Sequence, residues 1–252
     1  DGPRSAALGS APLLADTSVF NLFKTGSGAS VDPQQERLLH QVLGTPIAVP
    51  AQDGQGEALF GCGCFWGAEK GFWRLPGVVT TAVGYAGGQL ADPSYEQVCS
   101  GRTGHAEVVR VVWNAEQIGF SDLLKLFWEC HDPTQGDRQG NDRGSQYRSC
   151  IYAEDPALLQ LAEASREQYQ AQLSAAGFGP ITTQIASGQH FYAAESYHQQ
   201  YLAKPGSRPY CSAQPSGVPL GTFAGADYRL DPRVWQAFDW SIAHCVLRGD
   251  NA

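Results

Sequence analysis

The run HAEVVRVVW at residues 105–113 constrains the fold of this chain more than any other segment. Its valines favour a β-strand, and Asn114 directly after it favours termination of that strand. Shorter strands are predicted at 57–62, 78–88, 147–152 and 181–186. Helical spacing of apolar residues recurs between and after them, at 66–75, 121–130, 156–173, 193–202 and about 232–247. This alternation through long loops predicts an α+β fold, a two-layer sandwich with a mixed β-sheet, a ferredoxin-like core and long coil extensions.

Local signals set several boundaries within this pattern. Ser121 is the predicted N-cap of the helix at 121–130, and Pro156 lies in the predicted first turn of the next helix. Residues 203–225 are rich in Pro, Gly and Ser and are predicted to form a loop or mobile segment. A short helix is also predicted at 33–43. We therefore divide the chain into an N-terminal extension (1–55), a central domain (56–211) and a C-terminal extension with a final helix (212–252).

The charge and cysteine content argue against some functions. A formal net charge of −8 without a Lys/Arg cluster gives a nucleic-acid partner no electrostatic support. No apolar run approaches the length of a membrane span. Seven cysteines without a CxxC pair indicate mostly reduced thiols, with one or two in redox chemistry. The start DGPRSAALGSAPLLA has the composition of a transit-peptide remnant, so we expect a cytoplasmic or an organellar (plastid or mitochondrial) location.

The stretch GCGCFWGAEK at 61–70 places Cys64 between the end of a predicted strand and the start of a predicted helix. Backbone N–H groups and the helix dipole favour a thiolate at such a position. The flanking glycines allow a sharp turn. The large side chains of Phe65 and Trp66 follow directly. These residues are compatible with two interpretations, a nucleophile beside an aromatic wall or a buried cysteine in a tight turn.

Five separated motifs resemble the active-site pattern of one enzyme family. They are GCFWG (63–67), GYAGG (84–88), PSYEQVCSGRTGHAE (93–107), FWECHDPTQGDRQGNDRGSQYRS (127–149) and YHQQYL (197–202). In this order they are similar to the peptide methionine sulfoxide reductase A family, over about residues 57–211. The resemblance implies a thiol-dependent oxidoreductase for protein repair under oxidative stress. It would reduce methionine S-sulfoxide, both free and within proteins.

The resemblance also implies the catalytic groups. Cys64 attacks the sulfoxide sulfur, releases methionine and is left as a sulfenic acid. Glu107 is the acid that protonates the sulfoxide oxygen. The alternation of the 105–113 strand puts Glu107 on one face with Val109 and Val111, which favours burial and a raised pKa over a solvated place at a strand edge.

The remaining implied groups bind or polarise the substrate. Tyr95 and Tyr147 match hydroxyl donors to the sulfoxide oxygen, although both are also compatible with ordinary half-buried tyrosines. Asp142 matches a residue that organises the polar network, or else it is a turn residue in a Gly/Asn/Asp loop. Phe65 and Trp66 would form the apolar wall around the S-methyl group.

A second thiol is needed to reduce the sulfenic acid. Cys211, in the loop after YHQQYL, matches the family's recycling cysteine and is the preferred resolving residue. Cys245 lies on an apolar helical stripe with Val234 and Phe238, which favours packing, and it is an alternative resolving thiol. Cys62 is another alternative. The resemblance implies recycling by thioredoxin, no bound cofactor, no metal and a monomer.

Three competing interpretations remain at this stage. A thiol peroxidase or disulfide exchanger would share the reactive cysteine and its resolving partner. A metal-binding protein would use as ligands Cys62, Cys64, Cys130 and His131, although zinc sites usually have paired ligands at wider spacing. An inactive member of the family would serve as an interaction scaffold. Only the reductase interpretation accounts for the aromatic pair, the acid and the tyrosines together.

Overall fold

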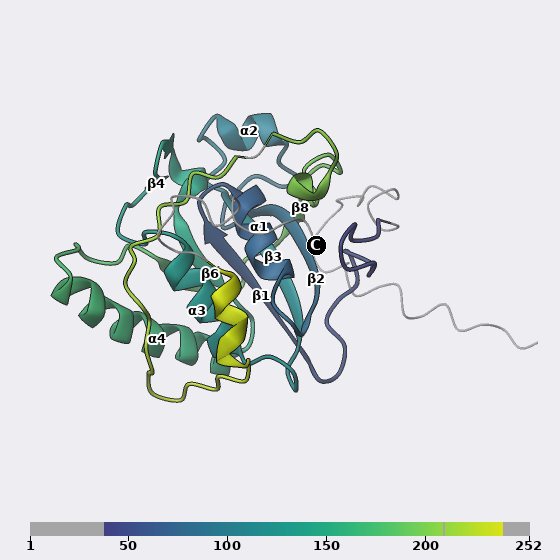
Figure 1. Cartoon of the computed structure of the whole chain (residues 1–252). Helices are drawn as coiled ribbons and strands as arrows, with labels where there is room; N and C mark the ends of the chain where they lie inside the picture. The colour runs from purple at the N-terminus through teal and green to yellow at the C-terminus, as the bar shows by residue number, and fades with distance from the viewer. Residues whose placement is uncertain (1–37, 209, 239–252) are drawn as a thin grey trace, which may run out of the picture. The chain divides into compact units, whose positions relative to one another are not determined.

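A six-stranded mixed sheet in the order β7-β6-β1-β3-β2-β8 organises the structure (Figure 1). This computed structural model describes residues 38–208 and 210–238, which belong to one unit, Val31–Ala252. The strands are β1 Gln55–Cys62, β2 Val78–Ala86, β3 Ala106–Asn114, β6 Ser149–Tyr152, β7 Gln184–Ala186 and β8 Tyr192–Ala193. Only the β6–β7 pair is parallel among the pairs of this sheet. The predicted α+β class with a mixed sheet is confirmed, and the ferredoxin-like detail stays a prediction.

The main hydrophobic core lies between one face of the sheet and the helices α1 (Phe65–Trp73) and α3 (Phe120–Cys130). Strand alternation places Val109 and Val111 of β3 in this core and Val108 in a separate cluster. The ring of Phe60 from β1 lies 4.7 Å from the ring of Phe72 on α1. The long helix α4 (Pro156–Ala175) begins at Pro156 as predicted and packs against α3. The alternating pattern of β3 therefore does set which side chains face the helices.

The start of α3 differs from the prediction that Ser121 is its N-cap. Gly119 is the N-cap, and Ser121 lies inside the first turn. The backbone N–H and the hydroxyl of Ser121 both donate to Asp227, at 2.9 and 2.6 Å. The carboxylate of Asp122 accepts from the backbone N–H of Gly119. The carboxylate of Asp227, from a distant part of the chain, thus accepts hydrogen bonds at the start of α3, the role that was expected of the Ser121 side chain.

The predicted helix at 193–202 is wrong. This segment is β8 followed by turns and a short 3-10 helix, Tyr201–Ala203. The side chain of Gln199 bonds both the N–H and the C=O of Val83, each at 2.9 Å. Gln200 takes a left-handed conformation, with φ 47°. The hydrogen bonds of Gln199 to β2 and of Gln200 to α1 replace the helical hydrogen bonds that the apolar spacing suggested.

The remaining elements are short. They are α2 (Tyr95–Cys99), the ribbon of β4 (Arg138–Gln139) and β5 (Asp142–Arg143), and 3-10 helices at Ser145–Tyr147 and Pro232–Ala237. Two predicted helices are covered only in part, because residues 33–37 and 239–247 lie outside the described residues. The described parts form a turn at 41–43 and the 3-10 helix at 232–237, not α-helix. Among the described residues, no helix combines the length and apolarity needed to cross a membrane.

Candidate active site

Cys64 lies at the junction of β1 and α1, as the sequence predicts. Cys62 ends the strand, Gly63 turns the chain, and Cys64 is the N-cap residue of α1. Gly63 has φ 89°, and a Cβ atom at this position would lie only 2.7 Å from the side chain of Gln139. A side chain is therefore excluded at residue 63 by both the backbone conformation and the space. This turn places the sulfur of Cys64 at the amino end of the helix.

The Cys64 side chain is buried, and the residue is 8% exposed. Burial raises the pKa of the Cys64 thiol well above its ordinary value, and the charge of Glu107 raises it further. The backbone N–H of Trp66 acts in the opposite direction. The stabilisation of a thiolate expected from the helix start is thus present but outweighed. Cys64 is a protonated thiol at rest.

Glu107 lies in β3, directly beside the start of α1. Its Oε2 atom accepts a hydrogen bond from the backbone N–H of Phe65 at 3.1 Å, and the residue is only 2% exposed. Burial raises the pKa of this carboxyl to about 8, the charge of Asp142 contributes to the increase, and the Phe65 N–H opposes it. Glu107 therefore carries a proton at neutral pH. The structure places it as a buried acid and not as the solvated edge residue of the alternative interpretation.

Tyr95 and Tyr147 come from different elements, the first turn of α2 and the 3-10 helix Ser145–Tyr147. Burial raises the pKa of both phenols, and the charge of Glu107 contributes to each increase. Both tyrosines therefore lie near the same carboxyl, and both keep their hydroxyl protons at neutral pH. The structure brings together a thiol, a protonated acid and two phenol donors, which can support nucleophilic attack with proton delivery.

Two hydrogen bonds anchor the segment that contains Cys211, and one of them involves Asp142. The hydroxyl of Tyr210 donates to Oδ1 of Asp142 at 2.5 Å, and the backbone N–H of Gln214 donates to Oε1 of Gln139 at 2.9 Å. The residues between these anchors form a loop, as predicted. Cys211 is not at the surface of this loop, however, because it is only 3% exposed. Its charge raises the pKa of Cys64. A Cβ atom at Gly63 would lie 3.6 Å from the hydroxyl of Ser212, so the segment with Cys211 packs against the turn that carries Cys64.

The aromatic pair after Cys64 is held by the turn that follows β8. Trp66 donates from Nε1 to Nδ1 of His198 at 3.1 Å, and its ring stacks on Tyr201 with 4.0 Å between ring centroids. The ring of Phe65 lies 5.2 Å from the imidazole of His198. Phe65 is buried and Trp66 is half-buried. Of the two predicted substrate-binding side chains, Trp66 is the more accessible.

Two residues of this turn were not singled out by the sequence, His198 and Glu195. Because Nδ1 of His198 accepts from Trp66, the ring proton is on Nε2, 3.9 Å from the carboxylate of Glu195. Glu195 accepts from the hydroxyl of Tyr85 at 2.8 Å and from the backbone N–H of Tyr95 at 2.9 Å. The YHQQYL motif marks this region, but the sequence alone does not show which partner each residue contacts.

Glu69 is a second buried acid that the sequence did not single out. It accepts from the hydroxyl of Thr81 at 2.9 Å and from the backbone and side-chain N–H groups of Gln200 at 2.9 and 2.8 Å. Burial raises its pKa to about 7, and these hydrogen bonds oppose the increase. Nε2 of His40 lies 2.8 Å from the Thr81 hydroxyl. Glu69 thus ties the turn that carries His198 and Tyr201 to α1 and β2.

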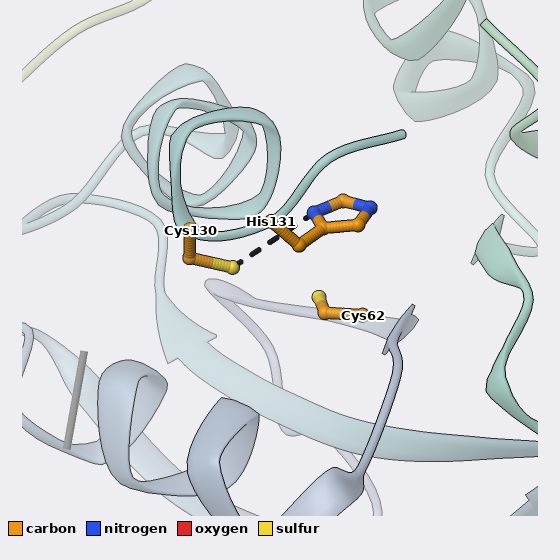
Figure 2. A group of neighbouring side chains, drawn as sticks. All are labelled: Cys62, Cys130 and His131. Carbon is orange, nitrogen blue, oxygen red and sulfur yellow. Dashed lines mark hydrogen bonds between the residues drawn. The ribbon is translucent and has the colours of Figure 1, made fainter. Parts of the chain in front are cut away.

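The other cysteines are distributed as follows. Cys99 ends α2 and Cys150 lies in β6. Three of the four residues considered as metal ligands, Cys62, Cys130 and His131, lie together, without Cys64 (Figure 2). Cys245 lies outside the described residues, so its prediction stays untested.

Comparison with known proteins gives consistent results. The family model described as "Peptide methionine sulfoxide reductase" matches residues 56–219. Peptide methionine sulfoxide reductase MsrA of Azotobacter vinelandii is 59% identical over 182 residues, which cover 72% of this chain and 83% of the relative. The mitochondrial peptide methionine sulfoxide reductase of Homo sapiens is 49% identical over 231 residues, covering 86% and 98%. The solved structure of methionine sulfoxide reductase A of Corynebacterium diphtheriae has a TM-score of 0.64 and 46% identity, covering 71% of this chain and 86% of that chain.

Proposed function

This chain belongs to the peptide methionine sulfoxide reductase A family and reduces methionine sulfoxide, and we propose that it does so with Cys64 as the nucleophile and Glu107 as the acid. The observation that carries the proposal is the position of Glu107, buried beside Cys64 with its pKa raised to about 8. A sulfoxide oxygen leaves sulfur readily only when it is protonated. An acid that holds its proton at neutral pH next to the nucleophile supplies that proton.

The proposed first step transfers oxygen from substrate sulfur to Cys64. The sulfur of Cys64 attacks the sulfoxide sulfur while Glu107 and the phenols of Tyr95 and Tyr147 donate to the sulfoxide oxygen. The products are methionine and a sulfenic acid on Cys64, and the proton of the Cys64 thiol replaces the one that Glu107 gave up. Oε2 of Glu107 is held by the N–H of Phe65, which leaves Oε1 to carry the proton toward the substrate. Asp142 favours this state, because its charge raises the pKa of Glu107.

The proposed substrate contacts follow from the aromatic residues after Cys64. The ring of Trp66, fixed by His198 and Tyr201, would contact the S-methyl group together with Phe65. An apolar surface of fixed orientation beside directional donors distinguishes the two epimers at a sulfoxide sulfur. The resemblance to the family implies which epimer fits, so we propose reduction of the S epimer, in free methionine sulfoxide and in proteins.

The proposed second step removes the sulfenic acid. The thiol of Cys211 condenses with it, so that a Cys64–Cys211 disulfide forms and water leaves. The packing of the Cys211 segment against the turn that carries Cys64 supports this pairing. Thioredoxin or a small dithiol would then reduce the disulfide, so the reaction needs no bound cofactor. We also propose that the protein is a monomer and that its location is cytoplasmic or organellar.

The test of the function is reduction of separate S and R epimers of a methionine sulfoxide peptide, with dithiothreitol as reductant. We expect methionine from the S epimer alone. Equal rates for the two epimers would contradict the proposed binding surface. Absence of product from both, together with peroxide reduction in a parallel assay, would favour the peroxidase interpretation.

Replacement of Cys211 with Ser is expected to remove nearly all thioredoxin-dependent turnover, because no intramolecular disulfide with Cys64 can form. Turnover with dithiothreitol should persist, since a small dithiol can reduce the sulfenic acid directly. The measurement compares steady-state rates with the two reductants. Cys150→Ser is the matched control, because Cys150 is buried in β6 outside the proposed relay. Unchanged thioredoxin-dependent turnover in Cys211→Ser would show that another thiol resolves the intermediate.

A further inference from the structure

A second group of thiols lies at the end of β1, next to the turn that carries Cys64. Cys62 ends β1, and Cys130 ends α3, with His131 directly after it. The two sulfur atoms and an imidazole nitrogen all lie within 4.8 Å of one another, and the three residues are 0–2% exposed. Figure 2 shows the three side chains turned toward a common space. Nothing in the proposed reduction of the sulfoxide uses this group.

The hydrogen bonds of His131 argue against a metal site here. Its Nδ1 atom lies 2.7 Å from the carbonyl oxygen of Phe127, which can only accept, so Nδ1 carries the proton. This is also the nitrogen that lies 4.0 Å from the sulfur of Cys130. Nε2 lies 2.8 Å from the hydroxyl of Ser149. A metal would need a lone pair that Nδ1 does not offer and Nε2 already uses, so the reactive atoms of this group are the two sulfurs.

The two thiols are neighbours of each other and of the resolving cysteine. The sulfur of Cys130 lies within 4.8 Å of that of Cys62, and the interaction with Cys62 raises the pKa of Cys130, as does the charge of Cys211. Cys211 acts in the same way on Cys64. A Cβ atom at Gly63, between Cys62 and Cys64, would lie 3.6 Å from the hydroxyl of Ser212, the residue after Cys211. The segment with Cys211 therefore packs against the turn that carries both Cys62 and the nucleophile. The two sulfurs lie within 4.8 Å of each other, and a disulfide would bring them to a bond length of about 2.05 Å.

We propose that Cys62 and Cys130 are a second redox-active dithiol, which takes the disulfide from Cys64 and Cys211 and so stores the oxidation of a first substrate. This inference rests on the proposed function, because that reaction generates the disulfide. It assigns to the buried pair a role that neither sulfur could perform alone.

The transfer is two thiol–disulfide exchanges. The sulfur of Cys130 attacks that of Cys211, so the Cys130–Cys211 bond forms, the Cys64–Cys211 bond breaks, and Cys64 leaves with the proton of Cys130. The sulfur of Cys62 then attacks Cys130, the Cys62–Cys130 bond forms, and Cys211 leaves with the proton of Cys62. Two electrons and two protons pass from the buried pair to the active-site pair. No external oxidant is needed.

Burial gives this pair a specific character. The interaction with Cys62 raises the pKa of Cys130, and burial raises it further. Because both sulfurs are also buried, few thiolates are available to soluble oxidants. Oxidation then reaches the pair mainly through Cys211. The restored Cys64 and Cys211 thiols can reduce a second sulfoxide before thioredoxin arrives.

The test counts methionine released by the reduced full chain, freed of reductant and mixed with excess S-sulfoxide peptide. We expect about two methionines per chain, against about one in Cys62→Ala and Cys130→Ala. The first methionine released by each variant shows that it is folded. Cys150→Ala is the matched control for loss of a buried thiol, and Cys245→Ser tests the other candidate thiol; both should release about two. Digestion without reductant and mass spectrometry should find a Cys62–Cys130 disulfide in the wild-type chain.

Each alternative outcome has a distinct meaning. About one methionine per wild-type chain would overturn the second dithiol but leave the proposed function intact. No methionine at all would overturn the proposed function. A second equivalent that persists in the Cys62 and Cys130 variants, or is lost only in Cys245→Ser, would overturn the assignment of the pair.

Discussion

Replacement of Cys64 with Ser is expected to lower kcat/KM for the S-sulfoxide by about 10⁴- to 10⁶-fold, to the background rate. A serine hydroxyl is a much weaker nucleophile toward sulfur than a cysteine side chain, and it cannot form the sulfenic acid or the disulfide that follows. The reductant should not matter, because the loss precedes every thiol exchange. The measurement is methionine release with dithiothreitol and, separately, with thioredoxin.

The matched control for this variant is Cys150→Ser, which replaces another buried cysteine, on the strand next to β1. Its activity should stay close to wild type. Thermal unfolding of both variants would show that the folds are preserved. Substantial turnover by a folded Cys64→Ser variant would assign the nucleophile to a different sulfur, with Cys62 the nearest candidate in sequence.

Replacement of Glu107 with Gln is expected to lower the rate of methionine release by about 10²- to 10⁴-fold, equivalent to about 3–5 kcal/mol of activation free energy. Glutamine has nearly the same shape as a protonated glutamate and can still accept from the N–H of Phe65. It cannot deliver a proton to the sulfoxide oxygen. The expected loss is therefore chemical and not structural.

The pH dependence separates this role from simple packing. The pKa of Glu107 is raised to about 8, so the acid is protonated below this pH and loses its proton above it. The wild-type rate should therefore fall as the pH rises through about 8, and Glu107→Gln should lack this fall. Single-turnover release without reductant is the right measurement, because dithiothreitol itself titrates. Glu129→Gln, a buried carboxyl on α3 bonded to Lys125, is the control. A fall near pH 8 that persists in Glu107→Gln would assign the titration to another group.

The sequence predicted best those features that depend on neighbours along the chain. The valines of β3 predicted a strand, and their alternation predicted that Glu107 shares the core face with Val109. The glycine turn before Cys64 and the helix after it follow from residues 61–70 alone. Period and turn chemistry are local properties, so they can be read without the fold.

The features that the sequence did not predict depend on distant partners. Ser121 lies inside α3 because Asp227, 106 positions later, bonds the start of that helix. The segment 193–202 is not helical, because Gln199 and Gln200 bond strand β2 and helix α1. Cys211 is buried because Asp142 and Gln139 anchor its neighbours. The helical and strand periodicity of a sequence does not show which distant residues will form hydrogen bonds.

The hydrogen-bond chain from His40 through Thr81 and Glu69 to Gln200 has a practical consequence for where the catalytic unit begins. Nδ1 of His40 faces the backbone N–H groups of Val42 and Leu43, so Nε2 donates to Thr81, which in turn donates to Glu69. A fragment trimmed to the region matched by the family model, 56–219, would lack His40. In that fragment the hydroxyl of Thr81 would lose the buried N–H donor of His40. This hydrogen bond belongs to the network that holds the turn carrying His198, the residue that binds Trp66. Fragments for expression should therefore begin upstream of residue 38, outside the region 56–219 that the family model matches.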